Sequence, residues 1–202
     1  SLFGISEDTD IGGLAYGAML ASYGMLTMAS VALAAGSSSI AGEEKGGFAS
    51  LLFANPVSRS GVLASRAGGL VTATLIGFAV LWASAFLIPE MLGVSTAGFH
   101  INALMLMMIV NALFYGFLAL ALGAWTGKTG LASGVAAAVM VVSFLAVGLL
   151  PLVESLAGLA KLFPWYYYQN GDAINAGVPW GDFAVLAAFV VAFAVVAFIG
   201  FN

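Results

Sequence analysis

Few side chains in this sequence could carry chemistry. Its 202 residues include five Lys or Arg, nine Asp or Glu, one His and no Cys. Without cysteine there is no zinc ribbon, iron–sulfur ligation or thiol catalysis, and the single His100 leaves little for a His-based metal site. The densest ionisable group is Glu43, Glu44 and Lys45, in which adjacent carboxylates could serve acid–base chemistry or charge pairing.

The patterns that come nearest to a catalytic motif fail on spacing. The intramembrane prenyl-protein proteases have an acidic pair like Glu43 and Glu44, but they place an Arg where this chain has Phe48. The run from Gly123 to Thr129 has one residue too few between its glycines for a phosphate-binding loop, and it follows an apolar helix instead of a strand. We therefore do not expect an enzyme.

The composition excludes a water-soluble globule. Hydrophobic residues make up 62% of the chain and charged residues 7%, whereas charged residues approach a quarter of a soluble domain. The net charge of -4, with no long basic run, argues against a nucleic-acid partner.

Long charge-free stretches predict an all-α membrane protein with a single transmembrane domain. Each stretch can hold a span of about 20 residues. No stretch alternates apolar and polar residues as a β-barrel strand would. We place five spans, at 14–39, 62–88, 101–124, 131–152 and 183–201.

The basic residues predict the orientation. Lys45, Arg59, Arg66 and Lys128 fall on one side of the predicted membrane, and Lys161 falls on the other with most of the acids. Basic residues in short loops stay cytoplasmic, so we expect the chain to begin outside and its last span to end inside. We expect a sixth span to precede Ser1; the alternative is a five-span protein with an exported tail.

The cytoplasmic connection 41–61 is long and patterned. Phe48, Leu51 and Leu52 recur at i, i+3 and i+4, which predicts a short helix lying flat at the surface, and Pro56 ends it. Such a helix could dock a partner or could only anchor the loop.

The external segment 152–181 is too short to cross the membrane again. Pro164 interrupts it before the aromatic run Trp165, Tyr166, Tyr167 and Tyr168. A re-entrant piece would imply a watery vestibule, because irregular backbone at membrane depth must be covered by protein or line a cavity. The favoured interpretation of the aromatic side chains is a belt at the headgroup level.

Within the spans, Asn111 is the polar residue nearest the middle of a helix. It would bond a neighbouring helix, with a place on a substrate path as the second possibility. Glycines four residues apart, such as Gly123 and Gly127 or Gly130 and Gly134, would permit close helix approach.

Taken together, the loop and the external segment resemble the membrane subunit of ATP-binding cassette transporters of the type-2 permease family. The loop residues that carry the resemblance are Glu43, Glu44, Gly46 or Gly47, Leu51, Leu52, Pro56, Ser58, Arg59 and Arg66. At the far end it rests on the run from Lys161 to Gly171 and on Pro179 to Asp182.

The resemblance implies a six-span permease in the cytoplasmic (plasma) membrane that exports its substrate. The loop would form a coupling helix against a separate ATPase subunit, which would bind ATP and Mg²⁺. The expected contact residues are Glu43, Glu44, Lys45, Phe48, Leu51, Leu52, Pro56 and Arg59. A second permease subunit, identical or paralogous, would complete the path. The alternatives are an ATP-independent channel or secondary transporter, and a structural membrane subunit of a larger complex.

Overall fold

A computed structural model describes residues 11–41 and 59–201, and every regular element within these ranges is helical. The long helices are α1 (Ile11–Met19), α2 (Met25–Ala41), α4 (Arg59–Leu92), α5 (Ile101–Thr126), α6 (Thr129–Leu149) and α9 (Trp180–Phe201). Shorter pieces are the π-helix η1 (Leu20–Gly24), the 3₁₀ turns η2 (Leu150–Leu152) and η3 (Ala157–Leu162), and the short helices α7 (Pro164–Gln169) and α8 (Ala173–Ala176).

Five helical stretches are long and apolar enough to cross a membrane, which confirms the predicted number in the described part of the chain. They are Gly12–Ser37, Ser60–Leu92, Ile101–Thr126, Thr129–Leu152 and Trp180–Gly200. The first is not one regular helix, because the π-helix η1 interrupts it between α1 and α2. The fourth keeps its α-helical geometry only to Leu149 and ends in the 3₁₀ turn η2.

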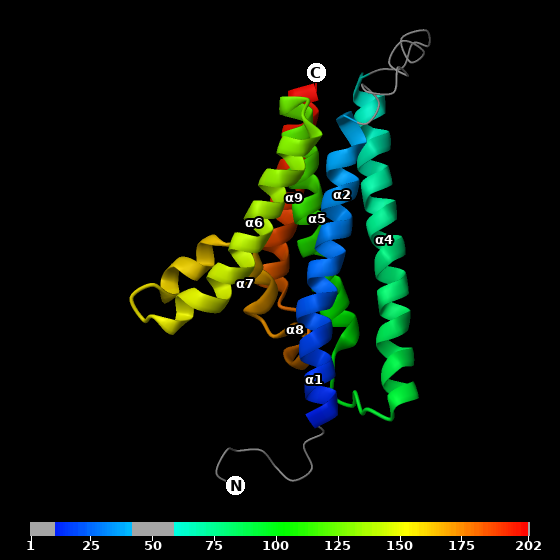
Figure 1. Cartoon of the computed structure of the whole chain (residues 1–202), viewed down its shortest axis with the longest axis vertical. Helices are drawn as coiled ribbons and strands as arrows, with labels where there is room; N and C mark the ends of the chain where they lie inside the picture. Colours follow the sequence, from blue (N-terminus) through cyan, green and yellow to red (C-terminus); the bar gives the residue numbers. More distant parts are fainter. Residues whose placement is uncertain (1–10, 42–58, 202) are drawn as a thin grey trace.

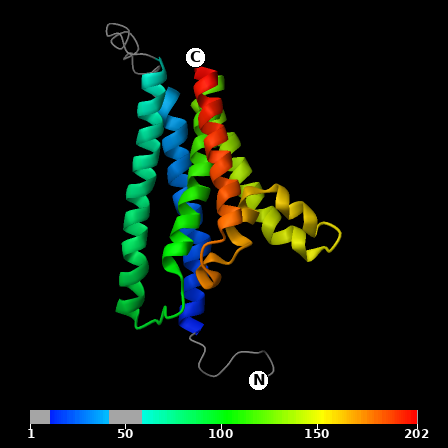
Figure 2. The same cartoon turned by 180° about the vertical axis from the view of Figure 1, so that it is seen from behind.

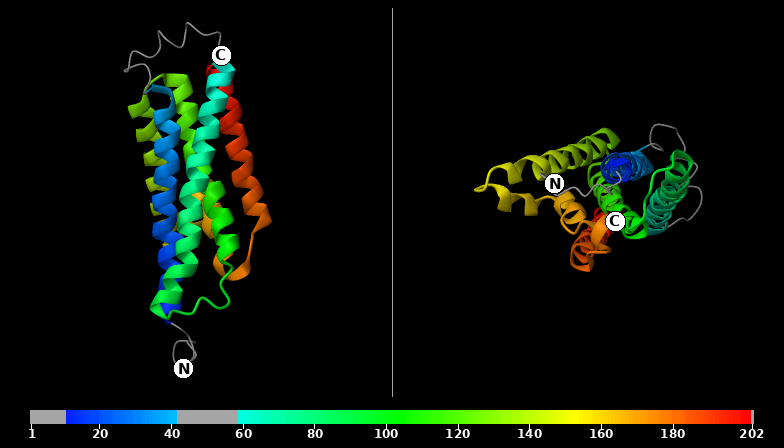
Figure 3. Two further views of the ribbon diagram at one scale, coloured as in Figure 1. Left: turned by 90° about the vertical axis from the view of Figure 1, so that its right-hand side faces the viewer. Right: turned by 90° about the horizontal axis from the view of Figure 1, so that it is seen from below.

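Helix α5 is the centre of the bundle. Figures 1 and 3 show α2, α4, α6 and α9 arranged around it, and it packs against all four. Of the most apolar 18-residue stretch of this span, 78% is buried inside the protein. In each of the other four spans the corresponding share is 28% or less. Hydropathy does not explain this position, since α9 is the more apolar span and is the least buried; the contacts of α5 with four neighbouring helices do.

The closest helix contact joins α2 and α5 through two glycines. A Cβ built on Gly36 would overlap the carbonyl oxygen of Gly116. A Cβ on Gly116 would lie 2.7 Å from Leu70 Cδ1 and 3.0 Å from the Ala32 carbonyl oxygen. The two backbones can approach this closely only because neither residue has a side chain. The predicted glycine pairs behave differently: Gly127 ends α5 at φ 64°, and Gly130 and Gly134 face open space.

The outer helices present large apolar side chains to their surroundings. Ile76, Val80 and Val191 are each more than 60% exposed. A water-soluble protein of this size seldom exposes so continuous an apolar surface. The five long apolar helices and their exposed apolar surface are those of a multi-pass helical membrane protein.

Charge separates the two ends of the bundle. One end carries the start of α4 and the turn between α5 and α6, and with them Arg59, Arg66 and Lys128; we call it the basic end (Figure 1, top). The opposite, acidic end carries the end of α4 with Glu90, and α7, α8 and the start of α9 with Asp172 and Asp182. These are the groups of residues that the sequence assigns to opposite sides.

Candidate functional site

The chain between α6 and α9 folds back onto the bundle. Turns η2 and η3 form an arm that projects sideways, and α7 and α8 then return to the bundle (Figure 2). Helix α7 packs against α5, α6 and α9, and α8 packs against α5. The segment thus consists of short helices and turns, none of which is long enough to cross a membrane. Pro164 is the first residue of α7, where the missing amide hydrogen is not needed.

Two aromatic side chains of α7 lie inside the protein. Trp165 is fully buried and packs edge-to-face on Phe144 of α6, with ring centroids 5.2 Å apart, and Tyr168 is 3% exposed. The prediction of an aromatic belt is therefore wrong for these two residues, because protein atoms cover them. Tyr166 and Tyr167 are half-buried.

The Tyr168 hydroxyl joins the returning segment to the first span. It donates a hydrogen bond of 2.6 Å to the carbonyl oxygen of Ala21. Ala21 lies in the π-helix η1, where the i→i+5 pattern displaces carbonyls from the regular helical ladder. Burial raises the pKa of the Tyr168 phenol well above its usual range, so the hydroxyl remains a donor at neutral pH.

Four buried residues with polar side-chain atoms lie in the helices around α7: Asn111 and Tyr115 of α5, Ser143 of α6, and Trp165 of α7 itself. Asn111 and Tyr115 are one turn apart on α5, and the Tyr115 hydroxyl lies near Ser143 without a well-formed hydrogen bond. Ser143 precedes Phe144, the residue on which Trp165 packs.

Within the described chain both amide atoms of Asn111 and the indole nitrogen of Trp165 lack hydrogen-bond partners. The predicted helix-to-helix bond of Asn111 is therefore not formed there. Each unpaired buried polar group costs about 1–3 kcal/mol, which is the condition that favours an internal water or a polar ligand at this depth.

A cavity of about 380 Å³ opens at the acidic end between the first span and the returning segment. We call it the α7–α8 cavity. Its polar side chains are Ser22, Gln169, Asp172 and Asn175, together with Tyr168, whose hydroxyl bonds to Ala21. The rest of its wall is Gly17, Ala18, Ala21, Leu104, Ala173 and Ile174.

Asp172 has an unusual backbone conformation in this cavity. Its φ of 44° and ψ of 55° place it in the left-handed region, and it is the only non-glycine residue with positive φ in the described ranges. Such a conformation costs about 1–3 kcal/mol for most residues, less for Asp and Asn, and is concentrated at functional sites. The Asn175 amide donates to both carboxylate oxygens, at 3.0 and 2.9 Å, and fixes the carboxylate orientation.

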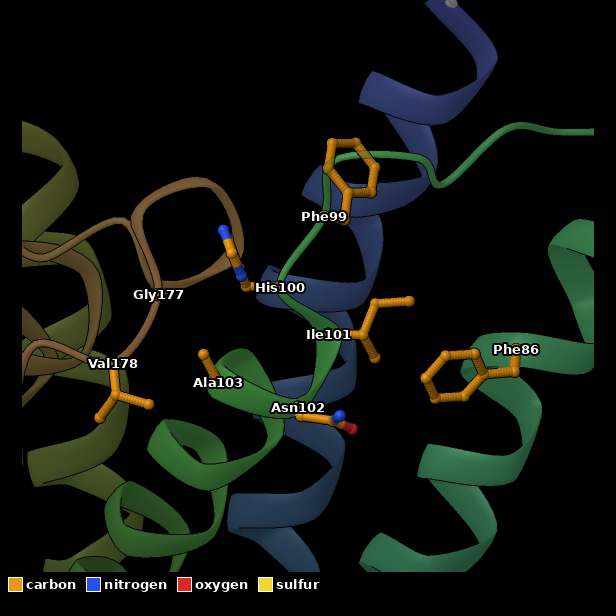
Figure 4. A pocket seen from close by; sticks show the side chains of 8 residues that line it. All are labelled: Phe86, Phe99, His100, Ile101, Asn102, Ala103, Gly177 and Val178. Atoms are coloured by element: carbon orange, nitrogen blue, oxygen red, sulfur yellow. The ribbon is translucent and has the colours of Figure 1, made fainter.

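A second cavity of about 440 Å³ lies over the start of α5 (Figure 4). Phe86 of α4 faces Ile101 and Asn102 of α5, while His100 lies toward the loop at Gly177. The Asn102 amide oxygen accepts a hydrogen bond of 2.8 Å from the Trp82 indole. Among the residues that line this cavity, His100 and Asn102 have polar side chains, and the others are apolar or glycine.

The predicted ATPase-contact residues cannot be placed in this geometry. Glu43, Glu44, Lys45, Phe48, Leu51, Leu52 and Pro56 lie outside the described residues, and Arg59 is the first residue of α4. In the described ranges no three His, Asp or Glu side chains converge to hold a metal ion.

No protein-family model, curated protein or solved structure matches the chain. The assignment of function therefore depends on the residues and the geometry.

Sequence reasoning missed three features of this site: the Tyr168–Ala21 hydrogen bond, the π-helix that contains Ala21, and the role of Asp172 in a cavity wall. The first two have no sequence signal, because nothing in the run Leu20 to Gly24 distinguishes it from a regular helix. Asp172 follows Gly171 and begins a short helix, which is a turn signal but gives no indication of a cavity.

Proposed function

We propose that this chain is the membrane-spanning permease subunit of an ATP-binding cassette exporter in the cytoplasmic membrane. It would form the substrate path with a second permease subunit and would couple to a separate ATPase subunit that binds ATP and Mg²⁺. The connection 42–58 would be the contact with that ATPase, on the cytoplasmic side.

The observation that carries this proposal is the returning segment between α6 and α9. Its short helices bury Trp165 and fasten Tyr168 to the first span, on the side of the bundle away from the start of α4. A permease that alternates between two open states needs one end that responds to the ATPase subunit and another that covers the substrate path. We assign the first role to the connection 42–58 and the second to the segment between α6 and α9.

The interiors of the spans argue against an ion-coupled transporter. Among the described residues of the spans, the buried polar ones are Ser37, Thr74, Asn111 and Ser143, and none of these four is ionisable near neutral pH. A proton relay or ion-coupled pump needs a titratable or charged group on its path. An external source of energy is the better explanation for transport through this bundle.

The test begins with purification of the protein from its native membranes in mild detergent, followed by identification of co-purifying chains and an ATPase assay. We expect a stoichiometric soluble subunit that hydrolyses ATP. The double variant Glu43→Lys, Glu44→Lys should lower transport-coupled ATPase activity by about tenfold or more, since like charges at a contact cost several kcal/mol.

The matched control is Glu154→Lys, which reverses one charge in the exposed arm at the other side of the molecule. It should leave coupling unchanged, and both variants should insert normally. A homo-oligomer without a bound ATPase, or full coupling in the double variant, would overturn the proposal and favour an ATP-independent channel or secondary transporter.

A further inference from the structure

We infer that the α7–α8 cavity binds small organic cations, compounds with a positively charged nitrogen and an apolar body. Its role as a substrate site rests on the permease function proposed above, whereas binding itself can be measured on this chain alone.

Charge selects the sign of the ligand. Asp172 is the one acidic residue that lines the cavity, and no Lys, Arg or His is among the lining residues. Asp172 is itself exposed at the cavity, so a dissolved cation can reach its carboxylate directly and is attracted by the opposite charge.

Shape selects the size and the body of the ligand. A volume of about 380 Å³ lies near the lower limit of small-molecule sites. Ala18, Ala21 and Leu104 supply an apolar wall on the side of the first and third spans, and Gln169 and Ser22 add neutral polar groups. An apolar body can therefore lie against the helices while the cationic group faces Asp172.

The carboxylate is held in position before any ligand arrives. The two hydrogen bonds from Asn175 fix the plane of the Asp172 carboxylate. The left-handed backbone of Asp172 sets the direction in which the chain enters α8. Asn175 is neutral, so it orients the carboxylate without cancelling its charge. A side chain restrained in this way loses little conformational freedom on binding, which favours affinity.

The cavity also adjoins the hydrogen bond that holds α7 against the first span. Tyr168 lines the cavity, and its hydroxyl bonds to Ala21, another lining residue. A ligand in the cavity therefore contacts both partners of the bond between α7 and the first span. Occupancy would be communicated directly to the element that would cover the transport path.

The experiment uses the full chain in lipid nanodiscs and measures binding of benzyltrimethylammonium by isothermal titration calorimetry. Benzyl alcohol and phenylmethanesulfonate serve as the neutral and anionic counterparts. Asp172→Asn removes the charge but keeps a residue type that tolerates the left-handed region. Glu154→Gln is the matched control, because it removes one carboxylate from the exposed arm outside the cavity.

We expect saturable binding of the cation and binding of both counterparts that is at least fivefold weaker. Asp172→Asn should raise the Kd of the cation about fivefold or more, and Glu154→Gln should change it by less than twofold. A second variant, Ala18→Phe, fills the cavity from an exposed helix position and should also weaken binding.

Three results would overturn the inference: no binding of the cation, equal binding of cation and anion, or equal effects of the Asp172 and Glu154 substitutions. None of them depends on an ATPase subunit. If the cation binds as expected but no ATPase co-purifies, the permease proposal fails and the cation site remains. If an ATPase co-purifies and the cation does not bind, the reverse holds.

Discussion

At the scale of single residues, the hydroxyl of Tyr168 fixes the returning segment to the first span. It is the one hydrogen bond that joins α7 to α1, η1 or α2 among those of the described side chains, and it spans 147 positions of sequence. We predict that Tyr168→Phe lowers stability by about 1 kcal/mol, the net value of a typical intramolecular hydrogen bond. The apparent Tm should fall by roughly 2–4 °C for a chain of this size, measured by intrinsic tryptophan fluorescence during heating.

Tyr166→Phe provides the control for this substitution. It removes the same hydroxyl from the same helix, but Tyr166 is half-buried and makes no hydrogen bond through its side chain. Its Tm should stay within the error of the parent protein. Equal shifts in the two variants would mean that the Tyr168–Ala21 bond does not hold the segment.

At the scale of helices, the contact between α2 and α5 depends on two glycines. We predict that Gly36→Ala destabilises the protein by about 1–3 kcal/mol or prevents its folding, because the new Cβ would overlap the backbone of Gly116 and force the helices apart. A side chain could move aside at such a point, but a helix backbone cannot do so without losing the contact. Size-exclusion profiles in detergent and thermal unfolding would measure the loss.

Gly68→Ala is the matched control, since a Cβ at Gly68 in α4 meets no atom within 4 Å. Alanine is the better helix former by about 1 kcal/mol, so this variant should be as stable as the parent or slightly more so. A Gly36→Ala protein that unfolds at the same temperature as Gly68→Ala would show that the helices are not in contact at Gly116.

The positions of the helices could be predicted from the sequence, but the contacts between them could not. The five spans were predictable because a charge-free run of adequate length has little choice in a membrane but to form a helix. The predicted 101–124 agrees closely with Ile101–Thr126, since charged or turn-forming residues mark its ends. What could not be predicted depends on contacts between elements: with 26 glycines in the chain, nothing marks Gly36 and Gly116 as the pair that meets.

The candidate site was predictable only in part for the same reason. The sequence predicts short helices between the fourth and fifth spans, because prolines and polar residues interrupt that stretch. It could not predict that α7 turns Trp165 and Tyr168 inward, because aromatic residues at a membrane interface face lipid and protein alike. Nor could it predict the unpaired Asn111, because a hydrogen-bond partner is chosen by the packing.

At the scale of the whole molecule, the separation of charge between the two ends predicts how it lies in the membrane. Arg59, Arg66 and Lys128 belong to the basic end, and basic residues next to short loops are retained in the cytoplasm. We therefore expect the turn between α5 and α6 to be cytoplasmic and the connection between α4 and α5 to be external. The α7–α8 cavity would then open outside.

The absence of cysteine from the sequence makes this orientation directly testable. Thr126→Cys at the basic end and Ala97→Cys at the acidic end each add one thiol at an exposed position. In intact cells a membrane-impermeant maleimide should label Ala97→Cys and should label Thr126→Cys only after permeabilisation. The reverse pattern would invert the bundle and give the connection 42–58 to the external side, where no ATPase could reach it. Labelling of both positions from outside would contradict a bundle that spans the membrane between these two ends.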